Sequence, residues 1–381
     1  DRSLVRIVTG EGPAARYGLF DSIRSYVAEQ GDAKPLLAAA EEAHAEHVLS
    51  WAREQHKIAW THDGPDAIDA MSEQRENLVA IHERSVTRRP LRPTDVDRAL
   101  LVPVLLYPCT VERGPQALLT ALFSSAIDAA NLLNDLQQTQ LDQAIWVRAM
   151  ALHADMIANT GRASEGAALA QKAVQRGKKC GDLGALALAH YSAAITLRLS
   201  DHMDDAVKAA QTARATAQGA GDLAIEAQAL NVIGGVFYDL GEREMAAGCF
   251  HASLAAARQI GHYMQVARCT GNLGCVYADR GDVERAVPYF HESLGDARQQ
   301  KNRRGEGVIH SYLGIVAQER GNFGLAKVHY KRGLELLEQV GDTHRKAYVE
   351  GLFSWMLAET GDLKRAERIL RRIIDEFVAR G

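Results

Sequence analysis

Residues 267–290 read ARCTGNLGCVYADRGDVERAVPYF, and this stretch decides the fold. Its markers are Gly274, Gly281, Ala286 and Phe290, and residues of the same kind recur 40 positions earlier and 40 positions later. A second marker, a Gly-Asp pair or a close variant of it, keeps the same step of 40 residues. The chain therefore contains six units of this length, from about residue 147 to residue 381, with no insertion between them.

Each unit contains two stretches with the apolar spacing of a helix. In the quoted unit Leu273 and Val276 mark the first helix, and Phe290 and Leu294 mark the second. Gly281 between them accepts a positive φ and lets the chain reverse its direction. One helical hairpin cannot bury its apolar stripe on both sides, so the units must stack. The sequence predicts an all-α protein, an α-solenoid of helical hairpins with a concave inner surface.

Composition agrees with a helical chain and excludes several other classes. Of the nine prolines, only Pro288 lies after residue 115, and proline is the residue least compatible with a helix interior. The net charge of −4 leaves no basic excess for binding nucleic acid. The five cysteines are odd in number and form no C-x-x-C, which argues against a disulfide framework or a zinc site. We find neither a membrane-spanning run nor an export signal, so we expect a cytoplasmic protein.

Residues 94–146 predict one more helical hairpin, out of register with the 40-residue step. Its helices cover 96–106 and 117–136, and its turn contains Gly114 and Pro115. We expect this hairpin to be an atypical capping unit at the start of the stack. At the other end of the stack, we expect the basic last helix to close it with a charged outer side.

Residues 32–93 predict linking helices. One long helix covers 35–61, a turn follows at 63–66, and a further helix covers about 73–87.

Residues 1–31 have a different pattern. Two short apolar runs flank a turn at residues 10–13, which is typical of a β-hairpin, and a helix follows from Asp21.

The repeat in residues 267–290 resembles the tetratricopeptide repeat, although the usual unit of that family has about 34 residues. Longer units of this type resemble those of bacterial signalling regulators. The resemblance implies a right-handed superhelix whose inner surface binds a protein, a peptide or a small molecule.

Residues 16–26, RYGLFDSIRSY, resemble the last hairpin and helix of the winged-helix domain in STAND-type signal-transduction ATPases. That family includes bacterial regulators of the AfsR and MalT type, which control transcription. The resemblance implies that a nucleotide-binding domain precedes this chain, which begins at Asp1 rather than Met. The phosphate-binding pattern G-x-x-x-x-G-K-[ST] does not occur in the chain. We therefore expect this part of the protein to be no enzyme and to hold no cofactor.

Candidate binding residues follow from the tetratricopeptide resemblance, which implies that certain positions of each first helix line the inner surface. Matched residue by residue, these positions hold Tyr191, Arg198, Gln228, Asn231, Tyr238, Arg268, Asn272, Tyr312, Gln318, Tyr348 and Trp355. Asn272 stands where the family often has an Asn that grips a peptide backbone. For several of these residues the alternative is packing between helices. We predict no catalytic residue and no metal ligand.

The sequence thus predicts a sensor domain for a ligand or a protein, which regulates an upstream STAND ATPase in bacterial signalling. Its partners would be a ligand on the inner surface and the nucleotide-binding domain of the same chain, with no membrane and no nucleic acid. The alternative is a constitutive adaptor or scaffold for protein–protein assembly.

Overall fold

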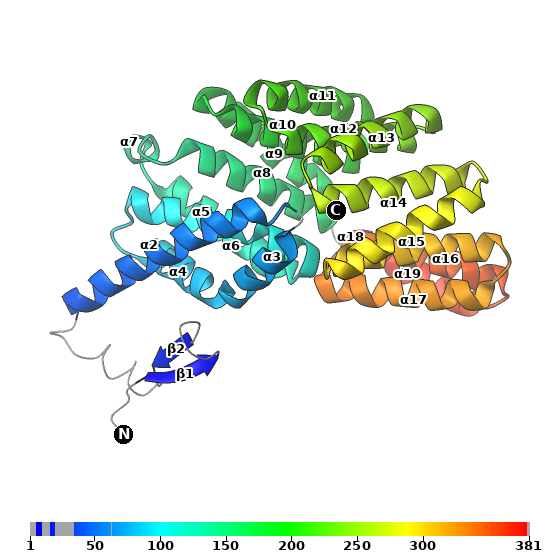
Figure 1. Cartoon of the computed structure of the whole chain (residues 1–381), viewed down its shortest axis with the longest axis horizontal. Coiled ribbons are helices and arrows are strands. Elements are labelled where there is room, and N and C mark those ends of the chain that lie inside the picture. The colour runs from blue at the N-terminus through cyan, green and yellow to red at the C-terminus, as the bar shows by residue number, and fades with distance from the viewer. Residues whose placement is uncertain (1–4, 10–15, 20–33, 62, 379–381) are drawn as a thin grey trace. The chain divides into compact units, whose positions relative to one another are not determined.

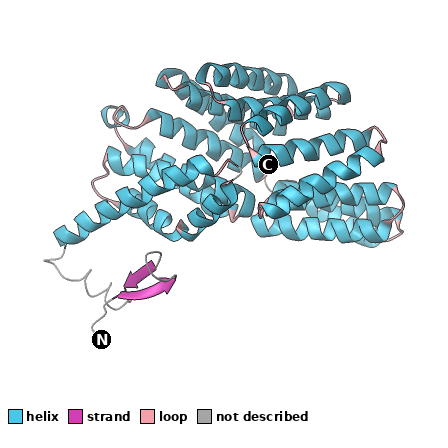
Figure 2. Cartoon of the chain, in the orientation of Figure 1, coloured by secondary structure: helices cyan, strands magenta, loops and turns pink. Residues whose placement is uncertain are grey.

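The computed structural model describes residues 5–9, 16–19, 34–61 and 63–378. The chain divides into two units, residues 1–52 and 53–381, and each is described by itself. In the first unit, strands β1 (Val5–Thr9) and β2 (Arg16–Leu19) pair antiparallel. The predicted turn at residues 10–13 and the predicted helix from Asp21 lie outside the described residues. Apart from the two strands, the described elements are helices (Figure 2).

The linking and capping regions contain more helices than the sequence predicts. Helix α2 (Lys34–Ile58) is followed by α3 (Gly64–Glu73) and α4 (Arg75–Thr87), where we predicted a turn at 63–66 and one helix. The turn prediction was wrong because Pro65 lies in the first turn of α3, where its missing N–H costs nothing.

The capping hairpin also differs from its prediction. It consists of α5 (Pro93–Arg113) and α6 (Gln116–Leu132), and the short α7 (Asp135–Gln138) follows. Helix α5 continues through Pro103 and Pro108 for seven residues beyond its predicted end at residue 106.

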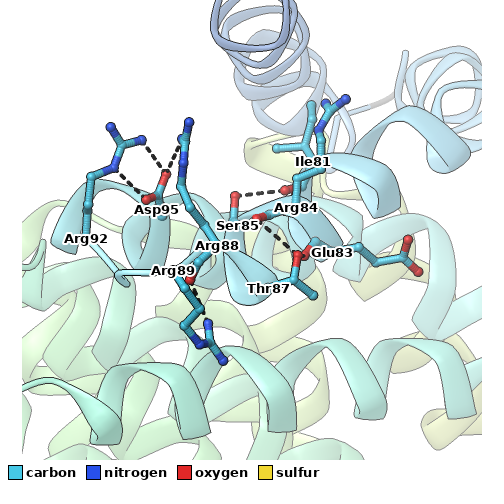
Figure 3. A network of polar contacts seen from close by, with 9 residues as sticks. All are labelled: Ile81, Glu83, Arg84, Ser85, Thr87, Arg88, Arg89, Arg92 and Asp95. Atoms are coloured by element: carbon cyan, nitrogen blue, oxygen red, sulfur yellow. Dashed lines mark hydrogen bonds and ion pairs between the residues drawn. The ribbon is translucent and has the colours of Figure 1, made fainter. Parts of the chain in front are cut away.

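An ion-pair network fixes the junction between α4 and α5 (Figure 3). Asp95, in the first turn of α5, accepts hydrogen bonds from Arg92 Nε at 2.7 Å and from Arg88 Nη1 at 3.2 Å. Burial alone would raise the pKa of Asp95, but the hydrogen bonds from the two arginines outweigh it and lower the pKa. The carboxylate therefore stays ionised, where it also favours the N-terminus of α5.

Twelve helices follow as six pairs, and each helix begins 20 residues after the previous one. The first pair begins at Gln143, four residues ahead of the boundary drawn from the sequence. The pairs are α8 (Gln143–Asn159) with α9 (Ala163–Cys180), α10 (Leu183–Leu199) with α11 (Met203–Ala220), α12 (Leu223–Asp239) with α13 (Arg243–Gln259), α14 (Tyr263–Asp279) with α15 (Val283–Gln299), α16 (Arg303–Glu319) with α17 (Phe323–Val340), and α18 (Thr343–Glu359) with α19 (Leu363–Val378).

The helices of a pair approach closely because glycine faces an aromatic ring. A Cβ added to Gly274 would lie 2.6 Å from Cε1 of Phe290, and one added to Gly314 would lie 2.7 Å from Cε1 of Tyr330. Where the second helix carries a smaller residue, as at Ala210, the first helix carries Ala194 instead of glycine. The sizes of the two positions are therefore matched within each pair.

The six pairs form a curved array (Figure 1). First helices of successive pairs contact one another, as α10 contacts α12 and α14 contacts α16, so they line the inner side of the curve. The array also closes on itself within residues 53–381, because α5 packs against α16 and α17, and α8 contacts α18. The sequence analysis did not predict this closure.

Hydrogen bonds hold the closed arrangement at several points. Arg113 Nη2 donates to the backbone oxygen of Gln300 at 3.1 Å, and Tyr263 Oη donates to that of Ala59 at 3.2 Å. Asp69 pairs with Arg113 and, at 2.7 Å, with Lys301 Nζ. These contacts join the linking and capping helices to the fourth and fifth repeats.

None of the described helices combines the length and the apolar character needed to cross a membrane.

Candidate ligand-binding site

Three arginines from three successive first helices converge inside the closed array. Arg268 lies on α14, Arg304 on α16 and Arg345 on α18. Burial lowers the pKa of Arg345, and the charges of Arg304 and Arg268 lower it further, so the three guanidinium groups lie within electrostatic reach of one another. Arg345 nevertheless keeps 37% of its side chain exposed, and Arg268 is exposed, so solvent reaches this arginine cluster.

Two acceptors hold Arg304 and Arg345 of the arginine cluster in place. Oδ2 of the buried Asp342 accepts hydrogen bonds from Arg304 Nε at 2.7 Å and from Arg345 Nη1 at 2.9 Å. Oδ1 of Asn159, at the end of α8, accepts from Arg304 Nη2 at 2.9 Å and from Arg345 Nη1 at 3.1 Å. Burial alone would raise the pKa of Asp342, but the charges of Arg345 and Arg304 outweigh it and hold the pKa well below its usual range. The same contacts tie α8 to α16 and α18.

Asp155 on α8 adds a titratable group beside the arginine cluster. Its carboxylate accepts a hydrogen bond from Ser192 Oγ at 2.5 Å. Burial raises the pKa of Asp155 to about 7, although Ser192 and the charges of Arg304 and Arg268 act in the opposite direction. Near neutral pH the Asp155 side chain is therefore a mixture of neutral and ionised forms. The cluster of three arginines, Asp342 and Asp155 carries a net positive charge in either form.

Two tyrosines complete this region. Tyr191 on α10 shares a hydrogen bond with Arg268, and Tyr107 on α5 lies within electrostatic reach of Asp155 and Tyr191. Burial raises the pKa of both phenols, so both stay protonated and can donate a hydrogen bond. Phenol and guanidinium groups together can bind a carboxylate or a peptide carbonyl.

Several predicted site residues connect neighbouring first helices. Asn272 Nδ2 donates to Asn231 Oδ1 at 2.9 Å, which joins α14 to α12. In the same way Arg198 Nε pairs with Asp239 at 2.6 Å, and Gln318 Nε2 donates to Glu359 at 2.6 Å. Each pair of partners is 41 residues apart, and the Arg198–Asp239 and Gln318–Glu359 pairs occupy equivalent positions of the repeat, whereas the Asn231–Asn272 pair lies seven residues earlier in its helices.

The other predicted residues divide between packing and exposure. Tyr312 stacks on Phe290 with ring centroids 5.6 Å apart. The guanidinium carbon of Arg243 lies 4.3 Å from the centroid of the Tyr238 ring, and Gln228 Nε2 lies 3.3 Å from His262 Nε2. Tyr348 and Trp355 on α18 are exposed, at 55% and 64%. The structure thus brings together Tyr191 with Arg268 and Asn231 with Asn272, and it leaves Tyr348 and Trp355 accessible.

Sequence reasoning missed the residues that surround Arg268. These are Tyr107, Asp155, Asn159, Arg304 and Arg345. Asp155 gave a usable signal, because it is the one carboxylate in the mostly apolar helix α8. Arg304 and Arg345 gave none, since they occupy different positions in their repeats and lie near helix starts, where charged residues are ordinarily solvated.

Among the residues that the structure describes, no group of three or more His, Cys, Asp or Glu side chains is placed to hold a metal ion.

Comparison with known proteins identifies the repeat type. Residues 225–299 match the family model of the tetratricopeptide repeat. No curated protein sequence matches the chain.

Three solved structures have a similar fold. A Rap protein complexed with competence and sporulation factor has a TM-score of 0.61 at 13% identity, covering 88% of this chain and 100% of that chain. The Rap conjugation gene regulator of plasmid pLS20 in complex with the Phr* peptide has a TM-score of 0.57 at 18% identity. The match covers 79% of this chain and 84% of that chain. NprR in complex with its cognate peptide NprX has a TM-score of 0.53 at 15% identity. The match covers 75% of this chain and 80% of that chain. At these identities the likeness shows a shared fold alone.

Proposed function

We propose that this chain is a sensor module that binds a peptide with an acidic group on the inner side of its helical array. The observation that carries the proposal is the arginine cluster of Arg268, Arg304 and Arg345. It gathers three positive charges on the inner side of the array, close to Asp342 and Asp155, where Arg304 is mostly buried and Arg268 and Arg345 are reached by solvent. The two carboxylates do not cancel the three positive charges, so an anionic ligand would be attracted there and could accept hydrogen bonds from the guanidinium groups.

Neighbouring residues suit the rest of a peptide. The Asn231–Asn272 pair offers amide groups that match a peptide backbone, and Tyr191 offers a phenol close to Arg268. Trp355 and Tyr348 present large exposed rings, which are frequent anchors in binding sites. Two proteins of similar fold, the pLS20 Rap regulator and NprR, were solved with peptides, which supports the same class of ligand here.

The closed array offers a way for binding to become a signal. Asn159 bridges α8 to Arg304 and Arg345, which are the side chains that would meet the ligand. A ligand that draws these arginines away from Asn159 would favour an open array, and one that neutralises them in place would favour the closed one.

The parent protein belongs to the proposal as well. The resemblance of residues 16–26 to a winged-helix tail supports a STAND ATPase upstream, which this module would regulate by binding rather than by catalysis. The amino-acid sequence that precedes Asp1 tests this directly. A phosphate-binding loop there supports the regulator, and a parent chain without one contradicts it. Nucleotide hydrolysis by residues 1–381 alone would contradict the non-catalytic role.

A pool of random short peptides tests the binding itself. We expect the protein to retain peptides through gel filtration and to enrich those with acidic residues, identified by mass spectrometry. Arg268→Ala should lose most of this retention, because it removes an exposed charge of the cluster. The matched control is Arg332→Ala, which removes an arginine paired with Glu335 on the surface of α17. Absence of retained peptides, or equal retention by Arg268→Ala, would overturn the proposal.

A further inference from the structure

Asp155 places a buried carboxyl group beside the arginine cluster. The residue is 2% exposed, and it lies on α8 one helical turn before Asn159. Residues four apart share one face of a helix, and Oδ1 of Asn159 accepts hydrogen bonds from both Arg304 and Arg345. The carboxyl group therefore lies next to the place where an acidic group of a peptide would meet the arginines.

The contacts of Ser192 favour the protonated form of Asp155. Ser192 Oγ lies 2.6 Å from the backbone oxygen of Ala151 and 2.5 Å from Oδ1 of Asp155. A serine hydroxyl has one hydrogen to donate, and a backbone oxygen has none. Both contacts are hydrogen bonds at the same time only when Ser192 donates to Ala151 and a protonated Asp155 donates to Ser192. When Asp155 is ionised, Ser192 donates to it, and the backbone oxygen of Ala151 loses this hydrogen bond.

The protonation state of Asp155 changes the charge that a ligand meets. The three arginines and the ionised Asp342 leave two positive charges when Asp155 is neutral, but only one when Asp155 is ionised. The neutral form therefore binds an anionic ligand more tightly. Because linkage is reciprocal, a bound anionic ligand in turn favours the proton on Asp155.

The other titratable groups around the arginine cluster mostly keep their charge above about pH 6.5. Burial raises the pKa of Tyr107 on α5 and of Tyr191 on α10, so both phenols stay neutral. Asp342 stays ionised because the neighbouring arginines hold its pKa low. Burial lowers the pKa of His262 to about 4, and burial and the charges of the neighbouring arginines lower the pKa of His344. Asp155 is thus the group of the cluster whose charge changes near neutral pH.

Charged groups of α6 and α9 lie on the opposite side of α8. Asp128, Glu165 and Arg162, which precedes α9, lie within electrostatic reach of His153. Residues two apart point to opposite sides of a helix, so these groups do not face Asp155.

We propose that an acidic peptide and one proton bind together at the arginine cluster, and that Asp155 takes up this proton from the solvent. The inference rests on the function proposed above and adds its regulation. Ionised Asp155 is an internal anion that competes with the peptide for Arg268 and Arg304, whereas protonated Asp155 leaves both arginines to the peptide. Peptide affinity should therefore be highest in mildly acidic solution and should fall as the pH rises through about 7.

Peptide affinity at two pH values tests the coupling. The probe is the most strongly retained acidic peptide of the random pool that contains no histidine or cysteine, synthesised with an acetylated N-terminus so that it does not titrate itself. By titration calorimetry, the dissociation constant for the parent chain should be at least about fivefold higher at pH 9 than at pH 6.5. Asp155→Asn, which keeps this side chain neutral, should bind the probe equally well at both pH values.

The matched control is Asp128→Asn, which replaces an exposed aspartate on α6 and should keep the pH dependence of the parent chain. Unfolding midpoints measured at both pH values would show that each variant is folded. Equal pH dependence in the parent chain and in Asp155→Asn would overturn the inference, because the coupling would then belong to another group.

Proton uptake by the parent chain gives a second measurement that needs no variant. Calorimetry near pH 7.5 in phosphate and in Tris, which differ in ionisation enthalpy, should show uptake of roughly half a proton to one proton per bound probe. Binding without proton uptake and with equal affinity at both pH values would overturn the inference and leave the proposed function intact. A protein that retains no peptide from the pool at either pH would overturn both.

Discussion

Glycine and aromatic residues fit one another in size across the helix pairs. The clearest case is Gly274, which lies against the ring of Phe290, itself buried to 1% exposure. The ring is enclosed by its neighbours and has little room to move. The small residues of the repeat are therefore required by packing, in addition to any role in turns.

Replacing Gly274 by alanine should lower stability although alanine favours helix. The added Cβ overpacks the interface with Phe290, which we expect to cost about 1–3 kcal/mol and to outweigh the roughly 1 kcal/mol gained in helix propensity. Gly295→Ala is the matched control, because a Cβ there meets no atom within 4 Å in the middle of α15. The urea midpoint should fall for Gly274→Ala and rise slightly for Gly295→Ala. Equal increases for both would contradict the packing argument.

Asp155 should make stability depend on pH. Its native pKa of about 7 exceeds the ordinary 3.8, so the native state keeps a proton between about pH 4 and pH 7 that the unfolded chain has lost. Stability therefore falls as pH rises through this window. Asp155→Asn removes the effect while keeping an acceptor for Ser192. Its free energy of unfolding should exceed that of the parent chain by roughly 2–4 kcal/mol at pH 8, since one pKa unit is worth about 1.4 kcal/mol.

Denaturant unfolding of both proteins from pH 4 to pH 8 measures this difference. The advantage of Asp155→Asn should approach zero at the acidic end. A difference between the two proteins that does not change with pH would show that Asp155 is ionised throughout.

At the scale of elements, the turn between helices is the repeating constraint. From α8 to α18, one or two residues after each helix end, a residue has a positive φ, and it is glycine except at Asp201 (φ 64) and Lys301 (φ 52). An L-residue with a side chain pays about 1–2 kcal/mol in this conformation, and aspartate pays less than most. The helix that follows is often capped by Asp or Asn, as Asp282 accepts from the backbone N–H of Arg285 at 3.2 Å.

Asp201→Gly should therefore stabilise the turn between α10 and α11. We expect a gain of up to about 1 kcal/mol, because glycine adopts this φ without strain but loses more entropy on folding. Gly241→Ala, at the equivalent turn with φ 85, should destabilise by about 1 kcal/mol. Thermal unfolding of the two variants checks both signs, and a lower midpoint for Asp201→Gly would contradict the turn assignment.

The elements of the repeat could be predicted because their determinants are local. The 40-residue step of glycine, alanine and aromatic residues appears in the six helix pairs as a regular spacing of helix starts. The turn predicted at 63–66 was wrong because Gly64 and Pro65 suit the first turn of a helix as well as they suit a loop. A single sequence carries no local signal that separates these two uses.

At the scale of the whole molecule, the closure of the array was beyond prediction. Asn159 meets Arg304 and Arg345 across 145 and 186 residues of chain. Whether α8 meets α16 and α18 in space depends on the summed curvature of the helix pairs between them. Small rotations between successive pairs add up over the array. The same closure assembles the arginine cluster, which is why repeat positions alone identified Arg268 but neither Arg304 nor Arg345.

Asn159 should stabilise the closed array by joining α8 to Arg304 and Arg345. Asn159→Ala removes the shared acceptor of Arg304 and Arg345, so α8 should separate from α18 more readily and the radius of gyration from small-angle X-ray scattering should increase. Asn159→Asp keeps an acceptor and adds a negative charge, so it should hold the parent dimensions. An unchanged radius for Asn159→Ala would show that the other contacts suffice to close the array.

The central claim is that a peptide binds on the inner side of the array, at the arginine cluster. Hydrogen exchange measured by mass spectrometry, with and without the retained peptides, tests it most directly. The account predicts that protection increases in α10, α14, α16 and α18 and stays unchanged in the outer helices α11, α13 and α15. Protection confined to the outer helices or to α19, or no protection at all, would contradict it.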